Sequence, residues 1–252
     1  MTSSDRTQAH YDRLAADYDQ NWAYSPAYTG WMTRCILDRA ALQPGQVVAD
    51  IGCGTGLYSR GLAAAGGTVI CADPSQAMLD QLPGDSALQP VRASAQDIAA
   101  RRVTLPAEPL DVIVIKEAIH HVPASDRTAV LSGLAGLLSP VGRIVIVMLP
   151  ARIRYPLFTA ALQRFEHLQP DPVGIEAMLS ASGLDTELTY DGYPLSFAKD
   201  RYLAMVRNRY MSLLASFTDA ELEDGISEIR ERYSGDRLEF DDRFAFIRGV
   251  RA

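Results

Sequence analysis

The sequence predicts an α/β fold with a doubly wound, mostly parallel sheet. Between Val47 and Met148, short runs rich in Val, Ile and Leu alternate with helix-periodic segments. Such alternation is typical of parallel strands joined by crossover helices. The first run ends in three alternate glycines, Gly52, Gly54 and Gly56. Glycines at the end of a strand predict a tight turn where a ligand can approach bare backbone.

Helix-periodic segments separate the apolar runs. A helix is expected over residues 5–42, which hold many aromatic side chains, and another directly after the glycines, where apolar and small residues recur with helical spacing. A third helix is predicted from one apolar stripe, which comprises Val130, Leu134, Leu137 and Leu138. We expect Ser125 to cap the start of this third helix and Pro140 to help end it.

Beyond Met148 the pattern changes to helices with one further pair of strands. Thr218 and Glu221 have the spacing of a capping box, which predicts a helix start at Asp219. The expected elements are a helix within 150–172, a helix over Ile175–Ala181, a strand over Glu187–Tyr190, helices over Phe197–Leu214 and Asp219–Tyr233, and a strand over Phe240–Val250.

Length and composition limit the classes of protein. A chain of 252 residues is one domain, or one domain with a cap. The formal net charge of -7 and the lack of a Lys/Arg block argue against electrostatic binding of nucleic acid. The three cysteines lack zinc-site spacing, so we expect neither a metal nor a disulfide framework. No apolar run approaches the roughly 18 residues of a membrane span, so we expect a cytoplasmic protein.

The glycine loop decides which ligand the chain takes. A phosphate-binding P-loop needs a Lys after its glycines, and the dinucleotide fingerprint needs a third glycine where this chain has Leu57 or Ser59. The remaining pattern is an acid, Asp50, two residues before the first of three alternate glycines. A carboxylate there repels a pyrophosphate but can help hold an ammonium group. The loop therefore favours a ligand with a cationic head.

The segment Asp50–Gly56 resembles motif I of the class I S-adenosylmethionine-dependent methyltransferases. Further similarities follow in the family's order, at Val69–Ser75, Gln76–Leu79, Leu110–Ile115 and Leu137–Ile146. The resemblance is to the small-molecule branch, type 11 and ubiquinone-biosynthesis-like. It implies a Rossmann-like, seven-stranded sheet whose last two strands form an edge hairpin, with S-adenosyl-L-methionine as the cofactor.

The resemblance also implies a domain organisation. Residues 1–42 would form an N-terminal helical lid, with Tyr11 and Tyr18 over the cofactor. The alternative is an ordinary amphipathic helix that packs on the sheet. Residues 43–252 would form the methyltransferase domain, with helical cap insertions near 150–172 and 197–235. An insertion between the last two strands resembles the substrate cap of small-molecule methyltransferases.

Cofactor contacts are implied position by position. Gly52, Gly54 and Gly56 would face the methionine end, and Asp50 would help hold the amino group. Asp73, followed by Pro74, would accept from both ribose hydroxyls. The remaining contacts would come from Ser94 or Gln96 to the adenine amine, where the family usually has acids, from the amides of Ala95 or Gln96 to the ring, and from the backbone carbonyl of Lys116.

Catalytic candidates lie in the loop after the fourth strand. His120 and His121 are candidate general bases, because histidine titrates near neutral pH. We favour His120, and Glu117 is the second candidate; one histidine could instead only pack. A base is needed only where the acceptor must lose a proton. The loop lacks the Asn/Asp-Pro-Pro-Tyr/Phe pattern of enzymes that methylate adenine in DNA or glutamine.

The sequence thus predicts methyl transfer from S-adenosylmethionine to a small-molecule acceptor by in-line SN2 displacement. Two alternatives remain: a protein that binds the cofactor without methyl transfer, and a protein or RNA methyltransferase. We expect a monomer or homodimer that binds neither nucleic acid nor a membrane.

Overall fold

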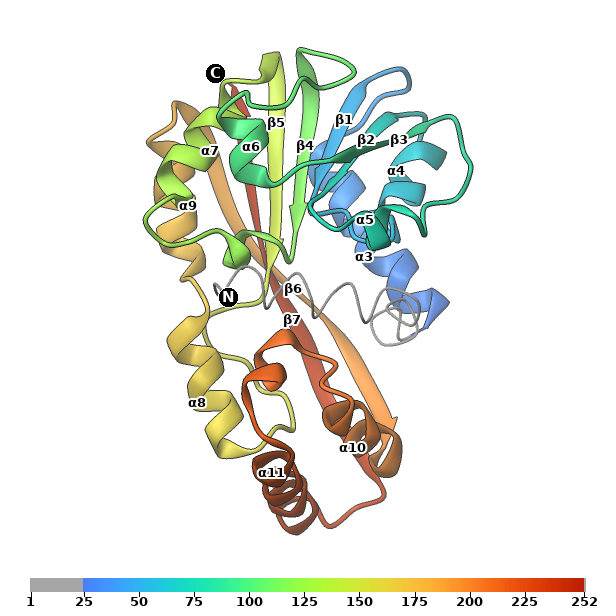
Figure 1. Ribbon diagram of the computed structural model, residues 1–252, viewed down its shortest axis with the longest axis vertical. Helices are drawn as coiled ribbons and strands as arrows, with labels where there is room; N and C mark the ends of the chain where they lie inside the picture. The colour runs from blue at the N-terminus through green and yellow to red at the C-terminus, as the bar shows by residue number, and fades with distance from the viewer. Residues whose placement is uncertain (1–24, 252) are drawn as a thin grey trace. The chain divides into compact units, whose positions relative to one another are not determined.

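The computed structural model describes residues 25–251 and contains one seven-stranded sheet with the strand order β3-β2-β1-β4-β5-β7-β6 (Figure 1). Strands β1 to β5 pair in parallel, and β7 runs antiparallel to β5. The predicted seven-stranded, mostly parallel α/β fold is confirmed. The strands are β1 Val47–Ile51, β2 Thr68–Asp73, β3 Leu88–Arg92, β4 Leu110–Lys116, β5 Leu138–Met148, β6 Leu184–Ala198 and β7 Arg237–Arg251.

Helices fill the connections between these strands. Those before β6 are α3 Pro26–Ala40, α4 Ser59–Ala64, α5 Gln76–Leu79, α6 Ala95–Ala99, the short 3-10 helix η2 Ile119–His121, α7 Arg127–Ala135, α8 Thr159–Leu168 and α9 Pro172–Ser180. Between β6 and β7 lie α10 Lys199–Arg207, the 3-10 helix η3 Ser212–Ser216 and α11 Asp219–Arg232. Helices inserted between the last two strands were predicted and are confirmed.

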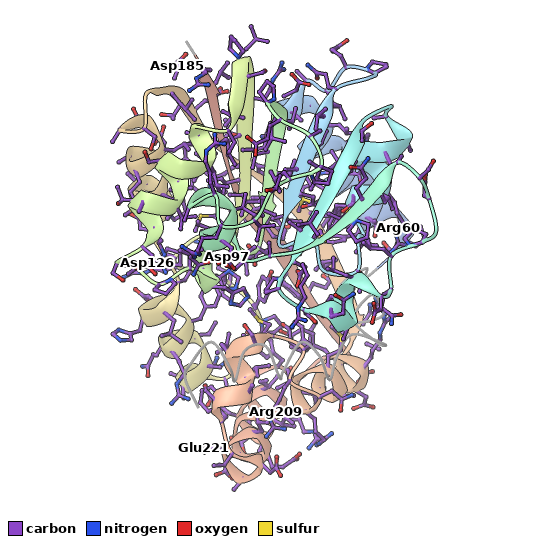
Figure 2. All side chains as sticks on the ribbon, turned by 45° about the horizontal axis from the view of Figure 1, so that its top comes forward. Arg60, Asp97, Asp126, Asp185, Arg209 and Glu221 are labelled. Carbon is purple, nitrogen blue, oxygen red and sulfur yellow. The ribbon has the colours of Figure 1, made fainter. Side chains whose placement is uncertain are left out.

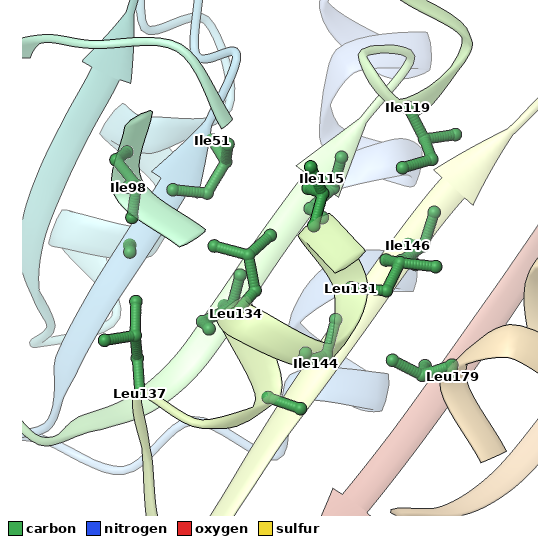
Figure 3. Close-up of a cluster of buried hydrophobic side chains, with 14 of the residues drawn as sticks. Ile51, Ile98, Ile115, Ile119, Leu131, Leu134, Leu137, Ile144, Ile146 and Leu179 are labelled. Carbon is green, nitrogen blue, oxygen red and sulfur yellow. The ribbon is translucent and has the colours of Figure 1, made fainter. Parts of the chain in front are cut away.

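Alternation along the strands divides the sheet into two faces. Figure 3 shows one face, where α7 lays Leu131 and Leu134 over the sheet near Ile115 and Ile146. Asp50 lies one position from the β1 residues of this apolar cluster, so its side chain points to the opposite face. Its register partners there are Cys71 on β2 and Val114 on β4. The sheet therefore presents an acid to the face where α4 begins.

The chain divides into two compact units, and each unit contains part of β6 and β7. The first unit reaches Met148 and adds Pro170–Thr189 and the segment from Ala245. The second comprises Leu149–Gln169 and Tyr190–Phe244. These bounds lie near the predicted cap insertions, but a role as substrate cap stays a prediction. So does the lid, because residues 1–24 lie outside the described residues.

The second unit has an aromatic core of its own. The ring centroids of Phe158 and Phe217 lie 5.0 Å apart in an edge-on arrangement. A Cβ on Gly225 of α11 would come within 2.5 Å of the Phe158 ring, so the helix and the ring approach closely only because this residue is glycine. The hydroxyls of the buried Tyr202 and Tyr210 lie 3.0 Å apart in a hydrogen bond. Edge-on ring pairs stabilise a core beyond the area they bury.

Two predicted boundaries around α7 are wrong. Asp126, rather than Ser125, is the N-cap, and the Ser125 hydroxyl donates to Asp126 Oδ1 at 2.8 Å. The turn that closes from the Asp126 amide to the Pro123 carbonyl places the helix start one residue later than expected. The helix already ends at Ala135. Leu138, predicted in the apolar stripe of the helix, and Pro140, predicted to help end it, both belong to β5 instead.

The predicted helix over Phe197–Leu214 is also wrong in its bounds. Phe197 still belongs to β6, which ends at Ala198; α10 stops at Arg207, and η3 follows as a separate turn. Arg209 has φ +55°, a left-handed conformation that ends a helix. The strand predicted over Glu187–Tyr190 is only the middle of the long β6. At the other end of the insertion, the predicted capping box of α11 is confirmed, with the Glu221 amide donating to the Thr218 hydroxyl.

Candidate active site

The glycine loop connects β1 to α4 at the carboxyl edge of the sheet. Gly52, Gly54 and Gly56 have φ values of +77°, +56° and +75°, which L side chains rarely adopt. A Cβ on Gly52 would lie 2.5 Å from the Cβ of Ala118, in the loop after β4. The glycines therefore allow both the turn and close packing against the loop that holds the catalytic candidates.

Asp50 lies at the base of this loop and is only 3% exposed. The Ser59 hydroxyl, on the first residue of α4, donates to Asp50 Oδ2 at 2.5 Å. Burial raises the pKa of Asp50 to about 6, the Ser59 hydrogen bond opposes the rise, and the charges of Asp73 and Lys116 act in opposite directions. Asp50 is thus ionised at neutral pH and titrates unusually close to it.

Asp73 ends β2 and joins that strand to the glycine loop. Its Oδ2 accepts from the Gly54 amide at 3.0 Å, and its Oδ1 accepts from the Ser75 amide at 2.8 Å. A carboxylate oxygen can accept two hydrogen bonds, so both oxygens can also accept from ribose hydroxyls. The neighbouring Pro74 is exposed, and its carbonyl accepts from Arg92 Nε at 3.4 Å.

Ser94 and Asp97 form a capping box at the start of α6. The Ser94 hydroxyl donates to Asp97 Oδ2 at 2.6 Å and accepts from the Asp97 amide at 3.1 Å. Figure 2 labels Asp97 in the first turn of this helix. The first amides of a helix have no intrahelical acceptor, so those of Ala95 and Gln96 are the groups that α6 offers to an adenine. Contact of Ser94, Ala95 or Gln96 with adenine stays a prediction.

The loop after β4 has an unusual backbone. Lys116 ends the strand, and its Nζ lies 4.8 Å from the centroid of the Tyr58 ring, in a cation–π contact. The next residue, Glu117, has φ +51°, and its amide donates to the Val147 carbonyl at 2.8 Å. A left-handed conformation at a residue other than glycine costs about 1–2 kcal/mol and is often found at functional sites.

His120 and His121 lie in η2 with their ring centroids 4.0 Å apart. The Nδ1 of His120 is buried and has no hydrogen-bond partner among the described residues, whereas the ring of His121 is exposed. Burial holds the pKa of His120 well below its usual range, and His121, Arg127 and Lys116 lower it further. His120 is therefore neutral at physiological pH and able to accept a proton or a hydrogen bond.

The structure brings the predicted residues of β1, β2, β4 and α6 to one edge of the sheet, where ligands bind in open α/β folds. Tyr11 and Tyr18 lie outside the described residues. Two absences hold for residues 25–251: they contain no group of three His, Cys, Asp or Glu side chains able to hold a metal, and none of their helices is long and apolar enough to cross a bilayer.

Residues 48–142 match a family model described as a methyltransferase domain. This match spans the glycine loop, Asp73, α6 and the His120 loop. Residues 48–142 are thus a methyltransferase domain, and methyltransferase relatives support the resemblance to the class I S-adenosylmethionine-dependent methyltransferases. The predicted family and its cofactor are thereby confirmed.

Two curated relatives match this chain over part of their own length. An uncharacterized methyltransferase of Geobacillus kaustophilus is 30% identical over 144 residues, which cover 54% of this chain and 60% of the relative. A ubiquinone biosynthesis O-methyltransferase of Coxiella burnetii is 29% identical over 115 residues, or 46% of this chain and 48% of the relative. The chain therefore spans between about half and three fifths of these curated relatives.

A solved structure shares the fold of the methyltransferase domain over most of the chain. It is a candidate methyltransferase from an antibiotic biosynthesis pathway of Anabaena variabilis, with a TM-score of 0.72 and 20% identity. The match covers 86% of this chain and 96% of that one. At this identity the likeness concerns the fold.

Some residues of the candidate site were missed from sequence. Ser59 is the donor to Asp50, Ala118 contacts the glycine loop, and Tyr58 lies under Lys116. These contacts join segments far apart in the chain or depend on a rotamer, which periodicity does not show. The capping box of Ser94 was visible, since Ser and Asp stand three residues apart before an apolar residue.

Proposed function

We propose that the protein transfers a methyl group from S-adenosylmethionine to a small-molecule acceptor. The observation that best supports this is the hydrogen bond from the Gly54 amide to Asp73, which places a carboxylate against the glycine loop. Such a loop suits ribose hydroxyls and an ammonium group and disfavours phosphates. The name of the Coxiella relative, a ubiquinone biosynthesis O-methyltransferase, adds support for a small-molecule acceptor.

The residues present fit the cofactor in their chemistry. Asp73 would bind the ribose, Asp50 and the Lys116 carbonyl would bind the amino acid end, and the amides at the start of α6 would bind adenine. The left-handed glycines leave bare backbone where the cofactor would pass. When bound, S-adenosylmethionine supplies an electrophilic methyl group on a sulfonium.

The chain's own residues would then position the acceptor and take up its proton. His120 is kept neutral by burial, so its imidazole can accept a proton from a hydroxyl or amine. Glu117 is the second candidate, and its backbone is held in place by the hydrogen bond that its amide donates to the Val147 carbonyl. Because the sulfonium is already reactive, the alignment of nucleophile and methyl group supplies much of the rate.

Calorimetry with S-adenosylhomocysteine and transfer of a labelled methyl group to extracted metabolites test the proposal together. We expect binding in the micromolar range and label in a small molecule. Binding without label in any acceptor would indicate a cofactor-binding protein. Label in protein or RNA would exclude the small-molecule assignment, and no binding at high micromolar concentration would reject the proposal.

Substitution at two histidines tests the proton acceptor. His120→Ala is expected to lose turnover on an acceptor that must lose a proton while it keeps affinity for S-adenosylhomocysteine. His167→Ala is the matched control, because this histidine is exposed on α8 and is not a catalytic candidate. Equal turnover in the wild type and His120→Ala would reject the role of His120.

A further inference from the structure

A buried polar cluster lies beneath the glycine loop. Asp50 on β1 is in register with Cys71 on β2, and Ser59 lies at the first turn of α4 on the same face of the sheet. Ser59 is fully buried, and Cys71 is buried as well. The Cys71 thiol donates to the Val69 carbonyl at 3.8 Å, and the Cys53 thiol, in the loop above, donates to the Gly54 carbonyl at 3.5 Å. Polar groups withdrawn from water in this way are stable only when their hydrogen bonds are satisfied.

Each element packed around Asp50 contributes a group that acts on its charge. From β2 comes the carboxylate of Asp73. The thiols of Cys71 on β2 and Cys53 in the loop face the Asp50 carboxylate, whose charge acts to raise the pKa of each thiol. From β4 comes the ammonium of Lys116, and from α4 the hydroxyl of Ser59. Burial and Asp73 favour the neutral acid, whereas Ser59 and Lys116 favour the carboxylate.

We infer that Ser59 is a positioning residue of the cofactor site: its hydroxyl fixes the carboxylate of Asp50 and keeps it ionised to hold the ammonium end of the cofactor. This inference rests on the proposed function. The O···O distance of 2.5 Å is that of a charge-assisted hydrogen bond, which is stronger than one between neutral groups.

A purely structural role does not explain a serine at this place. Alanine forms helices better than serine and needs no partner when it is buried. A hydroxyl on a side chain with 0% exposure costs free energy unless it is hydrogen-bonded, and its proton is donated to Asp50. Ser59 is the first residue of α4, and the N-cap residue before it, Tyr58, makes no side-chain hydrogen bond that caps the helix. The hydroxyl therefore serves the acid rather than the helix.

The inference predicts how cofactor affinity depends on pH. S-adenosylhomocysteine should bind more tightly as the pH rises through the pKa of Asp50, about 6, because only the carboxylate attracts the ammonium group. Loss of a hydrogen bond to a charged group should raise this midpoint by roughly one to two pH units in Ser59→Ala. At pH 7 the affinity should then fall about 2- to 10-fold, and at pH 9 it should match the wild type.

Two measurements on the full chain test this. Calorimetry with S-adenosylhomocysteine from pH 5 to 9 gives the midpoint for the wild type, Ser59→Ala and Ser59→Thr. Carbon-13 NMR of labelled aspartates gives the pKa of Asp50 in the same proteins without ligand, assigned with Asp50→Asn. We expect an upward shift in both readouts for Ser59→Ala and recovery toward the wild type in Ser59→Thr, which keeps the hydroxyl.

Ser182→Ala is the matched control, because this serine donates to a helix carbonyl away from Asp50 and should leave both midpoints unchanged. A wild-type midpoint with Ser59→Ala would overturn the inference, as would an equal shift with Ser182→Ala. Should Ser59→Ala fail to fold, Ser59→Cys replaces it, and an unshifted midpoint there rejects the inference as well. Failure of the wild type to bind S-adenosylhomocysteine would reject the proposed function, while the NMR titration would still decide the link between Ser59 and Asp50.

Discussion

The amide of Gly54 donates to the carboxylate of Asp73 at 3.0 Å, although 19 residues separate them along the chain. This hydrogen bond joins the turn after β1 to the end of β2, and the two strands are neighbours in the sheet. The same carboxylate accepts from the Ser75 amide at the start of α5. Asp73 therefore shapes the loop as well as offering oxygens to a ligand, and its removal should affect both.

Asp73→Asn should weaken the binding of S-adenosylhomocysteine by about 10- to 100-fold, since it removes the charge from one or two hydrogen bonds worth about 1.5–3 kcal/mol each. Calorimetry at pH 7.5 measures the change. Asp80→Asn, at an exposed aspartate just beyond α5, is the control and should bind as the wild type does. Equal affinity in Asp73→Asn and the wild type would exclude Asp73 from the cofactor site.

Gly52→Ala should disturb the loop in two ways, through its φ of +77° and through the approach of its Cβ to Ala118. We expect a loss of about 1–3 kcal/mol in the free energy of unfolding, together with weaker cofactor binding. Denaturant unfolding and calorimetry measure the two effects. Gly84→Ala is the control, because a Cβ there meets nothing within 4 Å.

A second substitution separates the two causes. Ala118→Gly in the Gly52→Ala background removes the clash but not the backbone strain, so it should restore only part of the lost stability. Full restoration of stability would show that backbone strain at position 52 is unimportant. No restoration would show that the contact with Ala118 is unimportant.

The sequence predicted the sheet well because strand period, glycine spacing and capping boxes are local signals. It predicted which residues meet at the sheet edge because parallel strands all end there. It did not predict the left-handed Glu117, since that conformation depends on the pairing of its amide with Val147 on β5. It also missed the hydroxyl that fixes Asp50, because a serine inside a helix pattern looks like any polar residue.

The long strands β6 and β7 were underestimated for a different reason. In the middle of β6, side chains are exposed or half-buried at successive positions, so apolar and polar residues do not alternate as they do on a sheet with one covered face. The sequence pattern there shows only the short stretch around Glu187. Strand pairing with β7, rather than a buried face, determines the length of β6.

His120 should make stability fall at mildly acidic pH. Its pKa in the folded protein lies well below the usual 6.5, so the unfolded chain binds the extra proton first as the pH falls. The stability that neutral His120 contributes is complete above pH 6.5 and is lost progressively as the pH falls from 6.5 toward the folded-state pKa. Urea unfolding of the wild type and His120→Asn between pH 5 and 8 measures this.

The wild type should lose more stability than His120→Asn between pH 6.5 and pH 5. His167→Asn, at an exposed histidine in the last turn of α8, should follow the wild-type curve closely. Parallel curves for the wild type and His120→Asn would mean that burial does not lower the pKa of His120.

Asp50 should affect the pH dependence of stability in the opposite direction. Its ionised carboxylate, at the base of the glycine loop, should lower the free energy of unfolding at neutral pH. Its folded-state pKa of about 6 lies above the ordinary 3.8, so the folded protein holds the proton more tightly than the unfolded chain does. The stability linked to Asp50 is complete below pH 3.8 and is lost as the pH rises through 6. The difference between these two pKa values corresponds to about 3 kcal/mol of unfolding free energy.

Asp50→Asn, which cannot ionise and still accepts from Ser59, should therefore be more stable than the wild type at pH 8 and lose this advantage toward pH 4. The same variant should bind S-adenosylhomocysteine more weakly at pH 8, because it lacks the charge. A gain in stability together with a loss of binding is expected where a site keeps a buried charge for function. Urea unfolding and calorimetry on the same samples measure both, and a variant less stable than the wild type at pH 8 would mean that burial does not raise the pKa of Asp50.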